Sequence, residues 1–95
     1  MTGQDKIKTR ALTKTEETIL EALHFMLSFE ELKEETGLTD ETLADALRVL
    51  IRDELAQVLA WQADKDDFIA LDEIPSDLSH HHFLATKRGL FSYHS

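Results

Sequence analysis

Apolar residues recur at helical spacing through the first half of the chain, with polar residues filling the positions between them. A capping box opens the first such run: the Thr13 hydroxyl can accept from the Glu16 amide while the Glu16 carboxylate reaches back. The apolar arc that follows consists of Ile19, Leu20, Ala22, Leu23, Met26 and Leu27. This pattern predicts a helix from Thr13 to about Leu27.

A helix-turn-helix spacing follows. Ser28–Glu31 is a second capping box, and it predicts a short helix that Gly37 ends in a left-handed conformation. Thr39 can cap a third helix, whose buried arc is Leu43, Ala46, Leu47, Leu50 and Ile51 and whose opposite face holds Glu41, Asp45, Arg48, Val49 and Arg52. Three residues, Gly37–Thr39, join the two helices, which is the spacing of a helix-turn-helix.

The helical spacing of apolar residues ends at Glu54, and the pattern after it is typical of strands. Two runs of β-branched and aromatic residues, Ala56–Gln62 and Phe68–Leu71, surround the turn-forming stretch Asp64–Asp67 and predict a β-hairpin. His82–Ala85 favours a third short strand. Thr86 can cap a final helical turn, which Gly89 weakens.

Length and composition limit the class of protein. The chain has 95 residues, 42% of them hydrophobic, and no Cys, so we expect one domain without disulfides or thiolate metal sites. The polar, basic residues 1–12 predict a flexible arm, and residues 13–95 a single domain. Because no apolar run reaches the ~20 residues that span a bilayer, and no signal peptide is evident, we expect a cytoplasmic protein that does not engage membranes.

Three stretches resemble the winged helix-turn-helix domain of bacterial transcription regulators. Leu12–Leu23 is similar to their opening helix, Ser28–Leu50 to their helix-turn-helix, and Phe83–Gly89 to the strand and cap that follow the wing. The resemblance implies an α+β fold of three helices followed by a β-hairpin wing, with a third short strand and a short C-terminal helical turn. It also implies that the third helix would enter the major groove of DNA.

The distribution of charged residues argues against DNA binding by the third helix. The net charge is −9, and most acids lie between residues 16 and 77. Ala44 and Asp45 stand where relatives commonly carry a small polar residue and then an arginine. A strong DNA binder neutralises ~6–10 phosphates, whereas the third helix offers Arg48 and Arg52 among five acids.

We therefore expect a protein-interaction module within a transcription-related assembly. Its partner-binding face would be Glu41, Asp45, Arg48, Val49 and Arg52, and its partner a protein, for which the acidic surface favours a basic one. The alternative is a small DNA-binding transcriptional regulator, whose nucleic-acid contacts would be Lys6, Lys8, Arg10, Lys14, Arg48, Arg52, Lys87 and Arg88.

Two aromatic residues bear on how a partner would dock. Phe25 lies off the apolar arc of the first helix, so it needs cover from a dimer interface or, more simply, from the N-terminal arm or Phe91 and Tyr93 of the same chain. Trp61 is expected to pack on the core as a strand residue rather than to anchor a partner.

The sequence favours neither a metal centre nor catalysis. In an extended segment side chains alternate, so at most His80 and His82 of the tract 80–82 share a face, and we expect no metal site there. Ser76, Asp77 and Ser79 lie in one short loop without a nucleophile elbow. We expect no catalytic residues, no cofactor and no enzyme.

Overall fold

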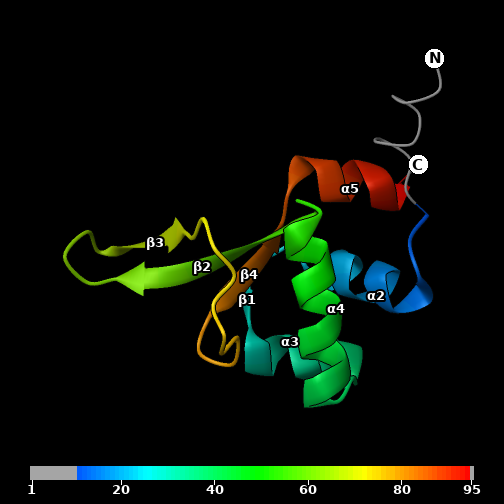
Figure 1. Cartoon of the computed structure of the whole chain (residues 1–95), viewed down its shortest axis with the longest axis horizontal. Coiled ribbons are helices and arrows are strands. Elements are labelled where there is room, and N and C mark those ends of the chain that lie inside the picture. Colours follow the sequence, from blue (N-terminus) through cyan, green and yellow to red (C-terminus); the bar gives the residue numbers. More distant parts are fainter. Residues whose placement is uncertain (1–10, 95) are drawn as a thin grey trace.

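A computed structural model describes residues 11–94 of the chain, with the side chain of His94 left aside. These residues form four helices and one antiparallel four-stranded sheet (Figure 1). The expected α+β class is therefore confirmed. In chain order the elements are α2 (Lys14–Ala22), β1 (Leu27–Ser28), α3 (Phe29–Thr36), α4 (Asp40–Arg52), β2 (Ala56–Gln62), β3 (Asp67–Ala70), β4 (His82–Ala85) and α5 (Lys87–His94).

The first helix is shorter than its apolar pattern predicts. The capping box is present, with the Glu16 amide donating to Thr13 Oγ1 and the Thr13 amide donating to Glu16 Oε1. However, α2 ends at Ala22, and the expected continuation to Leu27 is wrong. Leu27 and Ser28 instead form β1, which pairs with β4, because burying Leu27 opposite Phe83 in a sheet overrides its local helical spacing.

The helix-turn-helix spacing is realised by α3 and α4. Ser28 caps α3 through the predicted capping box, and Thr39 caps α4 by accepting from the Thr42 amide. Gly37 between them has φ +72°, in the left-handed region where a side chain is strained. The sequence signals at both ends of this turn are thus confirmed.

The sheet places the last strand in its interior. Its order is β1-β4-β2-β3, so β4 returns between β1 and β2 while β3 forms one edge. The predicted hairpin is present, with Trp61 opposite Phe68 and Gln62 opposite Asp67. Figure 1 shows its far end extending beyond the helices, which leaves the turn Ala63–Asp66 in solvent.

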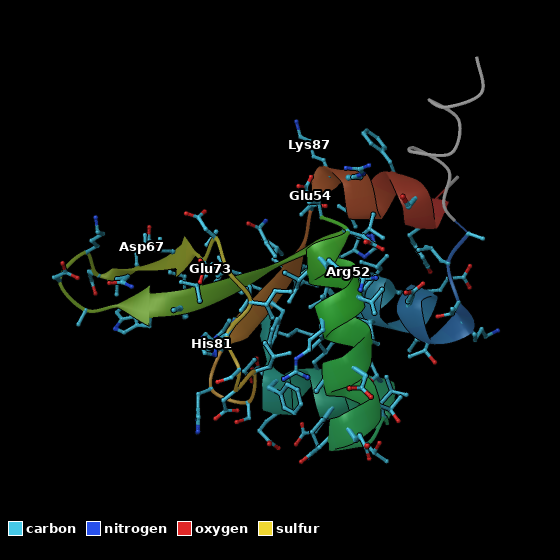
Figure 2. All side chains as sticks on the ribbon, in the orientation of Figure 1. Arg52, Glu54, Asp67, Glu73, His81 and Lys87 are labelled. Atoms are coloured by element: carbon cyan, nitrogen blue, oxygen red, sulfur yellow. The ribbon has the colours of Figure 1, made fainter. Side chains whose placement is uncertain are left out.

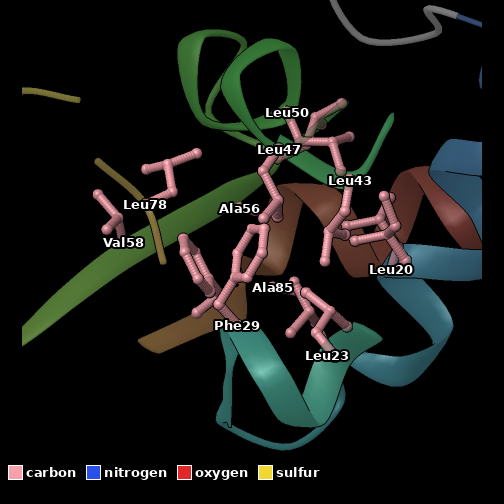
Figure 3. Packing of buried hydrophobic residues seen from close by; sticks show 14 residues of the cluster. Leu20, Leu23, Phe29, Leu43, Leu47, Leu50, Ala56, Val58, Leu78 and Ala85 are labelled. Atoms are coloured by element: carbon pink, nitrogen blue, oxygen red, sulfur yellow. The ribbon is translucent and has the colours of Figure 1, made fainter. Parts of the chain in front are cut away.

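One apolar cluster joins the helices to one face of the sheet (Figure 3). Helix residues Ile19, Leu20, Leu43 and Leu47 are fully buried in it, as are Val58 and Phe83 of the sheet. Leu78, from the loop 71–81, is 2% exposed and closes the cluster beside Phe29 and Val58 in Figure 3.

Helix α5 packs back on this core and is longer than the single turn predicted from sequence. Thr86 caps it by accepting from the Gly89 amide, and the Thr86 hydroxyl also donates to the Glu54 carbonyl. Gly89 lies so close to Leu55 that an added Cβ would stand 1.9 Å from the Leu55 carbonyl oxygen. The glycine therefore allows the helix to approach the backbone that precedes β2.

Among residues 11–94, no helix is long and apolar enough to cross a membrane. The predicted arm 1–12 lies outside the described residues except for Ala11 and Leu12, and Leu12 packs against the core.

Candidate interaction surfaces

The N-terminal half of α4 presents carboxylates to solvent. Asp40, Glu41 and Asp45 are exposed, as the acidic outer face predicted from sequence requires. Lys33 of α3 lies beside this end of α4, with Nζ 2.6 Å from an Asp40 carboxylate oxygen, and this contact raises the pKa of Lys33. Lys33, a cation beside this acidic surface, is thus already paired with one of its acids.

Val49 is less exposed than its place on the predicted outer face of α4 suggests. Its side chain is half-buried, so it offers only part of its surface to a partner.

The loop 71–81 covers part of the predicted face. Arg48 is half-buried, and its guanidinium donates to the Ser76 carbonyl oxygen at 2.9 Å. A cleft of about 310 Å³ lies between α4 and the loop, with Glu41 and Arg48 on one wall and Ser76 and Asp77 on the other. Arg48 therefore holds the loop against α4 and is not a freely presented cation.

The loop is itself ordered by local hydrogen bonds. Asp77 Oδ1 accepts from the amide and from the hydroxyl of Ser79, and these bonds lower the pKa of Asp77. His80 Nε2 lies 3.6 Å from Asp77 Oδ2. Within residues 11–94 no group of three or more His, Cys, Asp or Glu side chains is arranged to hold a metal ion.

Three of the cations assigned to the DNA-binding alternative line one groove. Arg52, Lys87 and Arg88 surround a groove of about 640 Å³ where α4 ends and α5 begins, and Figure 2 shows Arg52, Glu54 and Lys87 in this region. Its lining also includes the apolar residues Ile51, Leu71 and Ile74. Glu54 also lines the groove, and its carboxylate lies 3.4 Å from the Arg88 guanidinium.

The other cations of that alternative are elsewhere. Lys14 begins α2, and Arg48 lines the separate cleft between α4 and the loop 71–81. Lys6, Lys8 and Arg10 lie outside the described residues. The structure thus places Arg52, Lys87 and Arg88 around the same groove, although they come from segments far apart in the sequence.

Trp61 is on the surface, and the expectation that it packs on the core is wrong. It is 52% exposed, and its ring meets Phe68 edge-to-face at a centroid distance of 5.1 Å. The Phe68 ring in turn lies 4.6 Å from the ring of His82. The alternation along β2 contains the signal for this: Val58 faces the core, so Trp61 must face the other side.

A second group of exposed apolar residues lies near α2 and α5. Phe25 is 75% exposed and Phe91 74% exposed, so Phe91 does not cover Phe25 as the one-chain interpretation supposed. Between these segments the ring of His24 meets that of Tyr93, 6.0 Å away. Burial and the neighbouring Glu21 raise the pKa of Tyr93.

Comparison of the chain with protein-family models, with curated proteins and with solved structures gives no match in any of the three.

Proposed function

We propose that this chain is a winged helix-turn-helix domain that acts as a protein-interaction module. The arrangement of strands supports the fold part of the proposal. β1, which lies between the first and second helices described, pairs with β4, and β4 pairs with β2, the strand after the third helix. In this interpretation β1, β4 and β2 form the small sheet of a winged helix. The strand β3 and the loop 71–81 then enlarge the wing.

The main observation in support of the proposed function is the distribution of charge over α4 and the hairpin. The outer end of α4 exposes Asp40, Glu41 and Asp45, and the hairpin turn exposes Asp64 and Asp66. Lys33 and Arg48 are engaged with Asp40 and with the loop carbonyl, and Arg52, at the other end of α4, lies 3.4 Å from the Asp53 carboxylate. Such a surface attracts a basic protein and repels a phosphate backbone.

The proposed partner is thus a basic protein, within a transcription-related assembly, and the domain performs no catalysis itself. In this role the acids set the association rate and the choice of partner, while packed side chains set the dissociation rate. The proposed partner-binding face keeps Glu41, Asp45 and Arg52. Arg48 belongs to it as the residue that fixes the loop, and Val49 contributes only its exposed part.

The alternative function, a small DNA-binding regulator, is favoured by one observation. Arg52, Lys87 and Arg88 lie around one groove and would give a duplex three cations from two helices. Three contacts are fewer than the ~6–10 of a strong binder, so this function needs further cations from Lys6, Lys8 and Arg10.

A charge reversal separates the two functions. Asp45→Arg should weaken capture of a basic partner about tenfold or more, and it should strengthen binding of duplex DNA by α4. Glu17→Arg, an equal charge change on the exposed face of α2, is the matched control and should leave partner capture within about twofold. Both variants are titrated with a labelled duplex at low and at physiological salt, beside capture from lysate.

The proposal is wrong if the unmodified protein binds duplex DNA at micromolar or lower concentration in physiological salt. The regulator function then gains support if Lys87→Glu with Arg88→Glu abolishes that binding. Equal capture of the same protein by the wild type and by Asp45→Arg would also contradict the proposed face.

A further inference from the structure

We infer that the aromatic strip of the hairpin, Trp61, Phe68 and His82, binds an arginine side chain on an extended segment of the protein partner. This inference rests on the proposed function, since it supplies the chemistry by which a basic partner would be recognised. It concerns a different surface from the outer face of α4, so the two can be tested separately.

The pleat of the sheet places these three rings on one face. Val58 and its partner Phe83 point into the core and are fully buried. Leu59 and Trp61 are one and three residues after Val58, so they point to the other face of the sheet. Leu59 is opposite His82, and Trp61 is opposite Phe68. The rings of Trp61 and Phe68 are 5.1 Å apart and those of Phe68 and His82 are 4.6 Å apart. The strip therefore runs across β2, β3 and β4.

The strip offers ring surface to solvent in a fixed position. Trp61 is 52% exposed, while Phe68, which contacts it, and His82, which contacts Phe68, are half-buried. The edge-to-face contact at 67° fixes the indole against Phe68. A large aromatic side chain that is held in place loses little freedom on binding, which is the property of residues that dominate binding energy at interfaces.

Carboxylates stand at both ends of the strip. Asp64 and Asp66 are exposed in the turn that follows β2, and Lys65 is the only cation between Asp53 and His80. At the other end lies Glu31, whose carboxylate accepts from the Ser28 amide at 2.8 Å. The hydrogen bonds to the backbone and side chain of Ser28, and to a smaller extent the nearby His82, lower the pKa of Glu31. A ligand on the rings thus lies between negative charges.

Arginine is the side chain that fits this combination. A cation over the face of an indole is attracted by the ring quadrupole, and arginine makes such contacts more often than lysine. Its planar guanidinium can stack on a ring while its N–H groups donate to a carboxylate beside it. A nucleic acid base could stack on Trp61, but its phosphates would meet the same acids.

The edge of the sheet favours recognition by side chains rather than by added strand pairing. β3 is an edge strand, and the carboxylate of Asp67 already accepts from the Phe68 amide at 2.7 Å. This contact occupies a backbone donor, and an acid on an edge strand discourages pairing with another strand. The partner segment would therefore lie over the rings rather than extend the sheet.

The chain contains one tryptophan, so its fluorescence reports on this site directly. The probe is a synthetic peptide of alternating Arg and Gly residues, titrated into the full chain at low and at physiological salt. We expect a saturable change in Trp61 emission, about tenfold weaker binding of the peptide with Lys in place of Arg, and no saturable change with Glu in place of Arg. Equal responses to the three peptides, or none to the arginine peptide, would overturn the inference.

Variants are compared by the anisotropy of the labelled arginine peptide, because some lack the tryptophan. Trp61→Ala should weaken binding about tenfold, and Trp61→Phe by less, since a smaller ring remains. Asp64→Asn with Asp66→Asn should weaken binding and reduce its dependence on salt. Asn at residue 66 tolerates the left-handed φ of 53° found there, so the fold should be retained. Glu17→Gln is the control with an exposed acid removed elsewhere.

The outcomes separate this inference from the proposed function. If Trp61→Ala binds the peptide as tightly as the wild type, or if a single-stranded oligonucleotide competes for Trp61 at physiological salt, the inference is wrong. If a protein partner is retained equally by the wild type and by Trp61→Ala but lost from Asp45→Arg, the proposed function stands and the inference fails. Selective loss of arginine-peptide binding and of partner capture in Trp61→Ala supports it.

Discussion

Gly89→Ala should stabilise the protein if helix propensity alone decides, but destabilise it if the packing of α5 decides. The substitution therefore tests the packing of α5. Alanine is about 1 kcal/mol more favourable than glycine within a helix, so helix propensity alone predicts that this change stabilises α5. In the folded chain, however, the new Cβ would stand 1.9 Å from the Leu55 carbonyl oxygen and 3.3 Å from a Leu20 methyl carbon.

The obstacle at Gly89 is backbone, which does not rotate away. The Leu55 oxygen accepts from the Thr86 amide at 3.1 Å, so moving it also strains the bond that begins α5. Overpacking of a filled site costs up to about 3 kcal/mol. With the gain in helix propensity subtracted, we expect a net loss of about 2 kcal/mol in the free energy of unfolding, or a Tm lower by roughly 8–16 °C.

Urea and thermal unfolding followed by far-ultraviolet circular dichroism measure this loss. Phe91→Ala, two residues along the same helix and 74% exposed, is the control and should change the free energy of unfolding by no more than about 0.5 kcal/mol. Gly89→Ala that is as stable as the wild type, or more stable, would show that α5 does not approach Leu55 so closely.

Three further predictions concern the loop, the first helix and acid stability. Leu78→Ala should lower the free energy of unfolding by about 2–5 kcal/mol in urea titrations, because the Leu78 side chain is only 2% exposed although it lies in a loop. A loss below about 1 kcal/mol would mean that the loop does not close the core. Thr13→Ala should cost about 1 kcal/mol by the same assay, since it removes the hydroxyl that accepts from the Glu16 amide, and an unchanged midpoint would contradict the cap. The pKa of Glu31 is lowered on folding, chiefly by its bond to the Ser28 amide, so its contribution is present above its ordinary value of 4.5 and is lost as the pH falls through the lower folded value. Glu31→Gln should therefore weaken the dependence of stability on pH below about 4.5, measured as urea midpoints from pH 3 to 7; identical slopes in the two proteins would refute this origin.

The boundaries of most elements could be read from the chain because they depend on local chemistry. The hydroxyls of Thr13 and Ser28 meet amides three residues away, and Gly37 takes a backbone conformation that costs other residues more. Such interactions span a few residues and form in the same way wherever the segment lies. The helix of residues 40–52 and the strands of the hairpin followed for the same reason from their periods.

The predictions that the structure contradicts concern residues whose partners are far away in the sequence. Leu27 has helical spacing, but its pairing with Phe83 makes it a strand. For the candidate site, the acids of α4 were identified from sequence, whereas Val49 is more buried and Trp61 more exposed than predicted. Periodicity says which residues share a face, but it does not say what else covers that face.

Local sequence therefore determined the caps, the turn at Gly37, the periods of the helices and strands and the acidic character of the surface. Tertiary structure alone decided that β4 returns between β1 and β2, that Arg52, Lys87 and Arg88 line one groove, and that Trp61, Phe68 and His82 form a solvent-facing strip. The physical reason is that hydrogen bonds within a turn close over a few residues, whereas burial and the approach of distant side chains depend on how the whole chain packs.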